Sequence, residues 1–436
     1  MLPPTRHLLS FLQVVSLVDL TSATPSGKAQ SPPQQQPLSS SNDTKNAAPP
    51  PPVSAELFRS LERTSRIVDI TYCVGTSGIS QPFSCVSRCK EFPSFTLVST
   101  WNTGVLLSDS CGYIAVDHGV RRPGDEDRFN GEVGEEAIII AFRGTYSISN
   151  TIVDLSTIPQ EYVPYPSPDD GGEVPKETEH KCKECTVHMG FLTSWRQARR
   201  LVIPEVKKLR EQYPHYPIHL VGHSLGGAVA MLASLELKVS FGWDNIKVTT
   251  FGEPKVGNQG LCDYVDDVFG LKGEKDEHIS NRTYRRVTHA DDPVPLLPLT
   301  EWGYKPHAGE FYIAKAELSP SLEDVIACRS DSDASCITKG DGNFFESRVK
   351  GDLIQVVAAK SPTPPEGVVV VDKTISSSRW IKRLPGLPAR LKLWQLLFAH
   401  RDYFWRLGLC MPGGDPANWG RDKYGGRDGM VLSEEL

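Results

Sequence analysis

The sequence predicts an α/β fold in which a central, mainly parallel sheet is flanked by helices. From about residue 54 onward, short β-branched and apolar runs alternate with longer amphipathic stretches, which is typical of strand–helix–strand units. The chain has 436 residues, of which 39% are hydrophobic, so it can bury a sizeable core. We therefore treat residues 54–436 as one folded domain.

Six apolar runs are predicted to be strands, and four longer stretches are predicted to be helices. The strands are expected at residues 112–116, 137–142, 218–221, 248–251, 284–288 and 310–314. The helices, where apolar residues recur at helical spacing, are expected at residues 55–73, 191–212, 227–239 and 260–269. Pro204 lies inside the second helix, so a kink or a break is expected there.

The first 53 residues are expected to precede the folded domain. Residues 1–23 are typical of an export signal, because Arg6 and His7 precede an apolar stretch that ends in small residues. That stretch is far shorter than the roughly 20 residues of a membrane-spanning helix, so cleavage is expected, and a retained signal anchor is the alternative. Residues 24–53 contain eight prolines and no aromatic residue, which predicts a disordered linker or propeptide.

Composition excludes several classes of function. The formal net charge of -6 argues against nucleic acid as a partner, because phosphate binding needs a basic surface. No apolar run of 18 or more residues follows the N-terminal stretch, so no stable transmembrane span is expected after signal removal. The ten cysteines lack a repeated zinc-ligand spacing and favour disulfides. With glycosylation acceptors at Asn42 and Asn281, they indicate a secreted, extracellular glycoprotein.

Residues 218–227 carry the strongest chemical signal. A predicted strand runs into a G-x-S-x-G motif, and a helix of small residues follows. In such a turn Ser224 is strained and exposes its Oγ above the sheet, while Gly222 and Gly226 leave room where strand and helix pass closely. The N–H groups at the start of the helix point at the reacting oxygen. Ser224 is therefore the predicted nucleophile of an α/β-hydrolase fold.

An acid is expected after the nucleophile, because α/β-hydrolases carry their triad in the order Ser, Asp or Glu, His. Asp291 and Asp292 follow a predicted strand and precede a turn that two prolines stiffen. Asp292 is preferred because it directly precedes that turn. Asp291 is the alternative, as a residue that caps the turn.

Among the histidines that follow Ser224, three are considered as candidates for the base. His289 precedes the acid, and His307 leads into a predicted strand, which favours a structural role. His400 follows the acid and is flanked by apolar residues, as expected of a base in a lipophilic cleft, so it is preferred. His223 adjoins the nucleophile and is expected to point elsewhere.

Several separated motifs between about residues 70 and 410 resemble those of the fungal secreted lipases of the class 3 lipase family, whose relatives include feruloyl esterases. They are AFRGTYSI at 141–148, CTVHMGF at 185–191, FGEPKVGN at 251–258, DPVP at 292–295 and AH at 399–400. The resemblance implies that Ser224 is the nucleophile, Asp292 the orienting acid and His400 the general base. It implies no metal and no cofactor.

The resemblance also implies an oxyanion hole and a lid. The backbone N–H groups of Thr145 and Leu225 would form the hole, and the Thr145 hydroxyl would assist. Residues 147–155 resemble the family's lid, a short helix that swings off the cleft at a lipid surface, and Ile148 and Ile152 are its apolar members. An ordinary surface helix is the alternative for this segment.

Most of the cysteines are expected in disulfides. Local pairs in turn-rich stretches are Cys85 with Cys89, Cys182 with Cys185, and Cys328 with Cys336. A zinc or redox role of the second pair is disfavoured, because no further pair or helix N-terminus accompanies it. Cys73 and Cys410 bracket the folded body at places similar to those that the family's long disulfide joins. The pairing of Cys111 and Cys262 stays open.

Residues 373–401 form a basic, apolar stretch without any acidic residue. One interpretation is a contact with an anionic lipid interface. The other is a core-packing helix with a solvated basic face.

These observations predict a secreted serine hydrolase that cleaves acylglycerols or other fatty-acid esters through an acyl-enzyme. The partner would be a lipid or ester substrate at a lipid–water interface, and we expect a monomer. An esterase for feruloyl or other aromatic acids is the second hypothesis. A catalytically inactive α/β-hydrolase fold that acts as a binding protein is the third, and the intact set of Ser224, Asp292 and His400 argues against it.

Overall fold

The computed structural model describes a defined part of the chain, all of it within one compact unit, Pro49–Leu436. The described residues are 53–104, 109–119, 136–145, 159–162, 182–272, 276–330, 333, 335–337, 398–412 and 414–419. Four predictions lie outside them: the export signal, the linker up to residue 52, the lid with Ile148 and Ile152, and the basic stretch up to residue 397.

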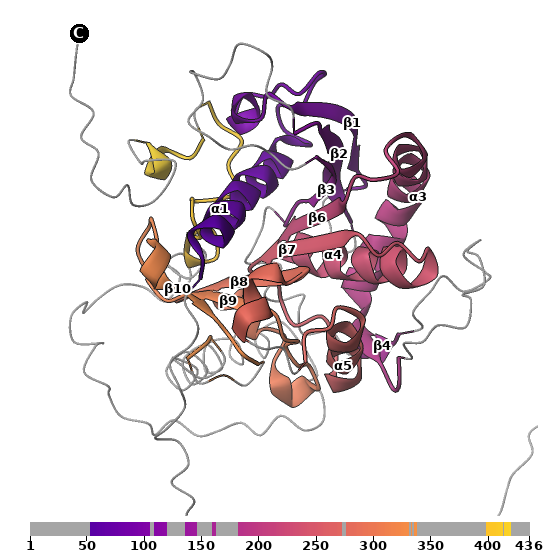
Figure 1. The fold of residues 1–436 in the computed structure, drawn as a ribbon, viewed down its shortest axis with the longest axis vertical. Coiled ribbons are helices and arrows are strands. Elements are labelled where there is room, and N and C mark those ends of the chain that lie inside the picture. The colour runs from indigo at the N-terminus through magenta and orange to yellow at the C-terminus, as the bar shows by residue number, and fades with distance from the viewer. Residues whose placement is uncertain are drawn as a thin grey trace, which may run out of the picture. The chain divides into compact units, whose positions relative to one another are not determined.

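An eight-stranded sheet forms the centre of the fold, in the order β1-β2-β3-β6-β7-β8-β9-β10 (Figure 1). The parallel strands are β3 (Ala137–Phe142), β6 (Ile218–His223), β7 (Ile246–Phe251), β8 (Tyr284–His289) and β9 (Glu310–Ile313). The antiparallel strands at the two edges are β1 (Phe95–Asn102), β2 (Cys111–Asp117) and β10 (Val325–Ala327). The predicted mainly parallel sheet is therefore confirmed, and each of the six predicted strands lies in it.

Four strands were not predicted. Besides β1 and β10, they are β4 (Pro159–Glu161) and β5 (Thr186–His188), which form a separate two-stranded sheet. Three of the four have only three residues, too few to show a period in the sequence. β1 is longer, but its register shifts between Leu97 and Ser99, which interrupts the alternation that identifies a half-buried strand.

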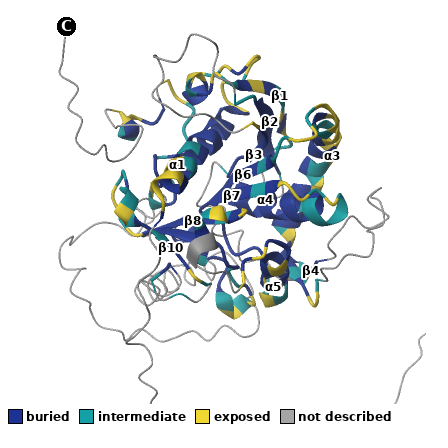
Figure 2. Cartoon of the chain, in the orientation of Figure 1, coloured by how far each residue is buried: buried dark blue, intermediate teal, exposed yellow. Residues whose placement is uncertain are grey.

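Helices cover both faces of the sheet. Alternate residues of a strand point to opposite faces, and β3 separates accordingly: Ile138 and Ile140 pack with one apolar cluster, whereas Ile139 packs with the other. The first cluster contains residues of α3 (Met189–Gln212), α4 (Leu225–Leu235) and α5 (Gln259–Val268). The second contains residues of α1 (Ala55–Ile70) and the C-terminal residues 403–405 and 407. Figure 2 shows that the sheet between these layers is buried.

The helices agree with the predicted ranges, with one correction. α1 continues as a 3-10 turn, Thr71–Cys73, and α4 continues as a π-helix, Glu236–Ser240. α3 runs without interruption through Pro204, so of the expected kink or break the break is wrong, and the kink stays a prediction. Proline costs an interior helix position about 3 kcal/mol, and the burial of one face of α3 in the core offsets that cost.

Four disulfides join the cysteines, in the pairs Cys73–Cys410, Cys85–Cys89, Cys182–Cys185 and Cys328–Cys336. The first ties the end of α1 to the C-terminal segment. Cys111 and Cys262 are buried and are not joined to each other.

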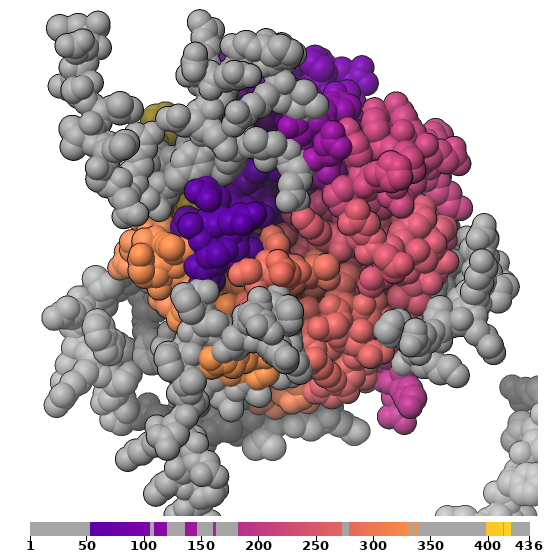
Figure 3. Space-filling model, viewed as in Figure 1, coloured from indigo at the N-terminus to yellow at the C-terminus, as the bar shows by residue number. Residues whose placement is uncertain are grey.

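None of the helices in the described ranges is long and apolar enough to cross a membrane. In the space-filling view, the indigo surface of α1 borders the orange part of the chain that includes β10 (Figure 3).

Candidate active site

Ser224 lies in the sharp turn between β6 and α4. Its φ of 57° and ψ of -129° are rarely adopted by L-residues, and its N–H donates to the Phe251 carbonyl oxygen at 2.9 Å. A Cβ on Gly222 would lie 2.2 Å from the Gly226 carbonyl oxygen, and a Cβ on Gly226 would lie 2.4 Å from the Phe142 carbonyl oxygen. The two glycines therefore leave the room that the turn needs, as the motif predicts.

His400 and Asp292 form a buried pair. Nδ1 of His400 is 2.9 Å from each carboxylate oxygen of Asp292, and neither side chain is exposed. Asp292 lies in the turn after β8, where its Oδ1 also accepts the Val294 N–H at 2.9 Å. The Tyr403 hydroxyl donates to Oδ2 of the same carboxylate. Three donors thus converge on one buried carboxylate.

Burial and hydrogen bonding act in opposite directions on Asp292. Burial alone would raise the pKa of its carboxyl group, but the His400 imidazole, the Tyr403 hydroxyl and the Val294 N–H favour the charged form. Their combined effect holds the pKa below its ordinary value. Asp292 is therefore ionised at neutral pH and can fix the Nδ1–H tautomer of His400.

The reactive atoms of the serine and the histidine are free of other partners. Within the described part of the chain, Ser224 Oγ and His400 Nε2 are both buried without a hydrogen-bond partner. His223, the neighbour of Ser224, stacks on the His400 ring with 4.7 Å between ring centroids. Because Asp292 occupies Nδ1 of His400, Nε2 is left to accept a proton. The structure therefore joins His400 directly to Asp292 and, through His223, to the turn of Ser224, while no hydrogen bond links Ser224 Oγ to His400 Nε2.

The two predicted oxyanion-hole residues adjoin Ser224. A Cβ on Gly144 would lie 2.8 Å from the Cβ of Ser224, so the next residue, the half-buried Thr145, lies beside the nucleophile. Leu225 begins α4, where helix geometry leaves its N–H without a partner inside the helix. The chain around Gly144 and the first residue of α4 therefore both adjoin Ser224.

His223 has a role that the sequence analysis missed. Its Nε2 is 2.9 Å from the His400 carbonyl oxygen, and its Nδ1 is 2.5 Å from the Tyr72 hydroxyl. A carbonyl can only accept, so Nε2 carries the proton and Nδ1 accepts from Tyr72. Burial and the nearby His400 imidazole lower the pKa of His223 to about 3, so the ring stays neutral. His223 therefore links the nucleophile turn to the backbone of His400.

Gly252 and Tyr403 were also missed. Gly252 follows β7 with a φ of 59°, and a Cβ there would lie 2.7 Å from Cε1 of His400 and 2.6 Å from the Tyr403 hydroxyl oxygen. Only glycine fits this position. Tyr403 follows His400 by three residues within the aromatic run 403–405, a pattern that suggests core packing as readily as a site.

The structure separates the preferred candidates from their alternatives. Asp291 is exposed with a φ of 66°, whereas Asp292 is buried. His307 Nε2 lies 3.0 Å from Glu253 Oε1, which agrees with a structural role. His289 ends β8, where burial lowers its pKa.

Metal ligands are not gathered in the described ranges. These contain no group of three or more His, Cys, Asp or Glu side chains that could hold a metal ion. Cys182 and Cys185, the one candidate motif in the sequence, are joined in a disulfide.

The sheet order, the strained serine after a parallel strand, and the later Asp–His pair define an α/β-hydrolase fold. A solved structure of the same fold is the Lip2 lipase of Yarrowia lipolytica. It matches with a TM-score of 0.59 and 26% sequence identity, over 84% of this chain and 99% of that chain.

Sequence comparison assigns the family. The model of the family described as Lipase (class 3) matches residues 139–302. "Lipase A" of Sodiomyces alcalophilus is 60% identical over 370 residues, which are 85% of this chain and 86% of that protein. "Secreted mono- and diacylglycerol lipase 2" of Gibberella zeae is 58% identical over 375 residues, 86% of this chain and 87% of that protein. The chain therefore belongs to the class 3 lipase family, and the predicted resemblance is confirmed.

Proposed function

We propose that this protein is a secreted lipase that hydrolyses acylglycerols, with Ser224 as the nucleophile, His400 as the general base and Asp292 as the residue that orients the histidine. The observation that carries the proposal is the buried Asp292–His400 pair. The His400 ring of this pair stacks on His223, the residue that directly precedes the strained Ser224. The family makes the protein a carboxylic ester hydrolase. A relative named as a secreted mono- and diacylglycerol lipase supports acylglycerols as the substrate class and secretion as the location.

The reaction follows from the contacts. Ser224 Oγ attacks the ester carbonyl while His400 Nε2 takes its proton, and Asp292 stabilises the imidazolium that forms. The histidine then returns the proton to the leaving glycerol oxygen, which departs as an alcohol. Water, activated by the same histidine, next attacks the acyl-enzyme and releases the fatty acid. No step in this sequence needs a cofactor.

The oxyanion of each tetrahedral intermediate needs donors. We assign this role to the backbone N–H groups of Thr145 and Leu225, with help from the Thr145 hydroxyl, because both residues adjoin Ser224. The positive end of the α4 dipole acts in the same direction. Loss of one such donor typically lowers turnover by about 10²–10³-fold.

The surroundings of the reaction complete the proposal. Export through the signal at residues 1–23 agrees with four disulfides, which persist in oxidising compartments. The segment with Ile148 and Ile152 is the proposed lid, which would open at a lipid–water interface. The protein would act there as a monomer.

The test compares wild type with Ser224→Ala on monoacyl-, diacyl- and triacylglycerols of one chain length, and on methyl ferulate. Released fatty acid or ferulate is measured by titration. Ser224→Ala should lower acylglycerol turnover by on the order of 10⁴-fold or more. The matched control is Ser234→Ala, a buried serine of the same helix whose hydroxyl bonds the Met231 carbonyl oxygen at 2.7 Å. It should keep its turnover.

Each outcome has a defined meaning. Hydrolysis of acylglycerols that requires Ser224 supports the proposal, and the ratio among the three glycerides gives the substrate preference. Turnover of methyl ferulate alone would assign an aromatic-acid esterase instead. Equal turnover by wild type and Ser224→Ala would reject the nucleophile. Absence of any turnover by folded wild type would favour the binding-protein hypothesis.

A further inference from the structure

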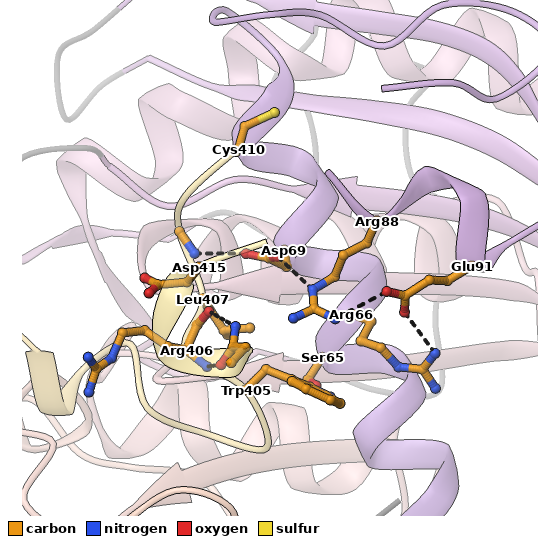
Figure 4. Close-up of polar contacts among 12 residues, drawn as sticks. Ser65, Arg66, Asp69, Arg88, Glu91, Trp405, Arg406, Leu407, Cys410 and Asp415 are labelled. Atoms are coloured by element: carbon orange, nitrogen blue, oxygen red, sulfur yellow. Dashed lines mark hydrogen bonds and ion pairs between the residues drawn. The ribbon is translucent and has the colours of Figure 1, made fainter. Parts of the chain in front are cut away.

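A buried carboxylate on α1 holds the segment that carries His400. Asp69 is 1% exposed, and its Oδ1 accepts the Gly408 N–H at 2.9 Å. Its Oδ2 accepts from Nε of Arg88 at 3.2 Å. Figure 4 shows these contacts between α1, the 3-10 helix Arg88–Glu91 and the C-terminal segment. The carboxylate therefore joins three parts of the chain at a place where water does not reach.

The loop between His400 and Gly408 transmits this attachment. The Leu407 N–H donates to the Arg401 carbonyl oxygen at 2.8 Å, and the Arg401 guanidinium donates back to the Leu407 carbonyl oxygen. Arg401 also pairs with Asp415 at 2.8 Å. The two ends of the loop are thus tied together, so the bond that fixes Gly408 also fixes the residue next to His400.

A second path from α1 reaches the same histidine. Gly408 faces the Tyr72 ring, since a Cβ added at this glycine would lie 3.6 Å from Cε1 of Tyr72. The Tyr72 hydroxyl bonds His223, which in turn bonds the His400 carbonyl oxygen. The Cys73–Cys410 disulfide adds a covalent link between the residue next to Tyr72 and the segment that carries His400. A change at Gly408 would therefore disturb His400 from both sides.

We infer that Asp69 is a positioning residue for ester hydrolysis: in its ionised form it holds Gly408 and the loop behind it, and so keeps His400 aligned between Asp292 and Ser224. The inference rests on the proposed function. It adds a residue that lies 339 positions before Gly408 in the sequence and acts on the histidine only through other residues.

The charges around Asp69 make its role dependent on pH. Arg88, Arg401 from the C-terminal segment and the Tyr113 hydroxyl from β2 face it. Burial outweighs the two arginines and raises the pKa of Asp69 to about 6. As the pH falls through about 6, the carboxyl group becomes neutral, its ion pair with Arg88 is lost and its bond to Gly408 weakens. The alignment of His400 should therefore be lost in mildly acidic solution.

This loss would not arise from unfolding. Because the pKa of Asp69 is raised in the folded state, the folded protein binds this proton more readily than the unfolded chain does. The contribution of Asp69 to stability therefore increases as the pH falls from about 6 towards 3.8. As the pH falls, activity should therefore decrease while the contribution of Asp69 to stability increases. A purely structural role of Asp69 does not predict these opposite changes.

The test is the pH profile of Asp69→Asn, with Glu56→Gln, an exposed acid on the same helix, as control. The measured quantity is kcat for p-nitrophenyl butyrate per active site titrated with a fluorophosphonate, from about pH 5 to about pH 8. At about pH 8, kcat of Asp69→Asn should be on the order of tenfold lower, with KM unchanged, because only the alignment of the base is altered. The ratio of wild type to variant should approach one below about pH 6. Glu56→Gln should follow wild type.

A measurement on wild type covers the case in which the variant does not fold. Hydrogen exchange of the peptide that contains Gly408, corrected for intrinsic rates, should show protection that falls as the pH drops below about 6. Protection that does not change with pH would overturn the inference. So would a kcat profile of Asp69→Asn that equals the wild-type profile, or one in which kcat is lower than in wild type by the same factor at every pH. Activity retained by Ser224→Ala would instead reject the proposed function, so the two failures are distinguishable.

Discussion

The serine side and the histidine side of the candidate active site are built in different ways. Ser224 is held mainly by residues near it in sequence, through the glycines on either side and the fully buried helix that follows, and its bond to Phe251 spans only 27 positions. His400 is held by residues far from it, since its bond to Asp292 spans 108 positions and its bond to His223 spans 177. The position of the proposed base therefore depends on the tertiary structure of the whole domain, whereas the strain of the serine is stored locally.

This difference has a thermodynamic consequence. Local contacts in a buried strand–turn–helix unit break only when the core unfolds, because α4 is buried along its whole length. The histidine segment packs in the second apolar cluster but lies outside the strand–turn–helix unit, and a buried ion pair and one long disulfide hold it to α1. We therefore expect partial unfolding to detach the histidine side first, while the serine turn persists.

The largest effect is expected from Asp292→Asn, which alters the histidine side alone. An asparagine can bond Nδ1 of His400 but does not stabilise an imidazolium and permits the wrong tautomer. kcat should fall by on the order of 10⁴-fold, while the serine turn stays intact. Steady-state kinetics with a soluble ester and circular dichroism of the same samples check both statements.

Its control is Asp291→Asn, at the exposed neighbour whose positive φ asparagine tolerates. This variant should remain within about twofold of wild type, because the side chain is exposed and has nearly the same size and shape. A similar fall in both variants would mean that the turn after β8, rather than the Asp292 carboxylate, supports the histidine.

The next effect concerns the long disulfide. Cys73→Ser with Cys410→Ser opens a loop of 337 residues and should lower the free energy of unfolding by about 6 kcal/mol in the chain-entropy model. In a urea titration, activity should then be lost at a lower concentration than helical circular dichroism. That separation would show the histidine side leaving before the core unfolds.

A short disulfide provides the control. Cys85→Ser with Cys89→Ser opens a sequence separation of only four and should cost about 2 kcal/mol, with activity and circular dichroism lost together. If the long-disulfide variant also lost both signals together, the two sides of the site would belong to one cooperative unit. The proposed order of detachment would then be wrong.

The same contrast explains what could be predicted from the sequence. The serine turn is readable because its glycines, strand and helix are consecutive, and the buried strand β3 is readable because all of its residues are apolar. Asp292 and His400 followed from chain order and family resemblance. Of the kink or break predicted at Pro204, the break was wrong, because tertiary burial of α3 outweighs a local propensity.

The unpredicted contacts are those of the histidine side. His223, Gly252 and Tyr403 have roles that follow from their contacts with His400 and Asp292, and no local pattern marks such contacts. Gly252 is an example: its need to be glycine comes from a histidine that lies almost 150 residues later in the chain. Sequence reasoning fails where contact order is high, for the same reason that these contacts depend on the whole fold.

The smallest effect is expected from Tyr403→Phe, which removes one of the three donors to Asp292. The pKa of Asp292 should rise, because this hydroxyl helps to lower it, but the carboxylate stays ionised at neutral pH through His400 and the Val294 N–H. kcat should therefore fall only roughly tenfold, about 1.4 kcal/mol, which is typical of one hydrogen bond to a charged group. Kinetics on the soluble ester measure it against Tyr264→Phe, a buried tyrosine whose hydroxyl has no partner in the described part of the chain. If Tyr403→Phe fell as far as Asp292→Asn, the hydroxyl would hold the whole histidine segment in place. If it matched Tyr264→Phe, the disulfide and the contacts to α1 would suffice without it.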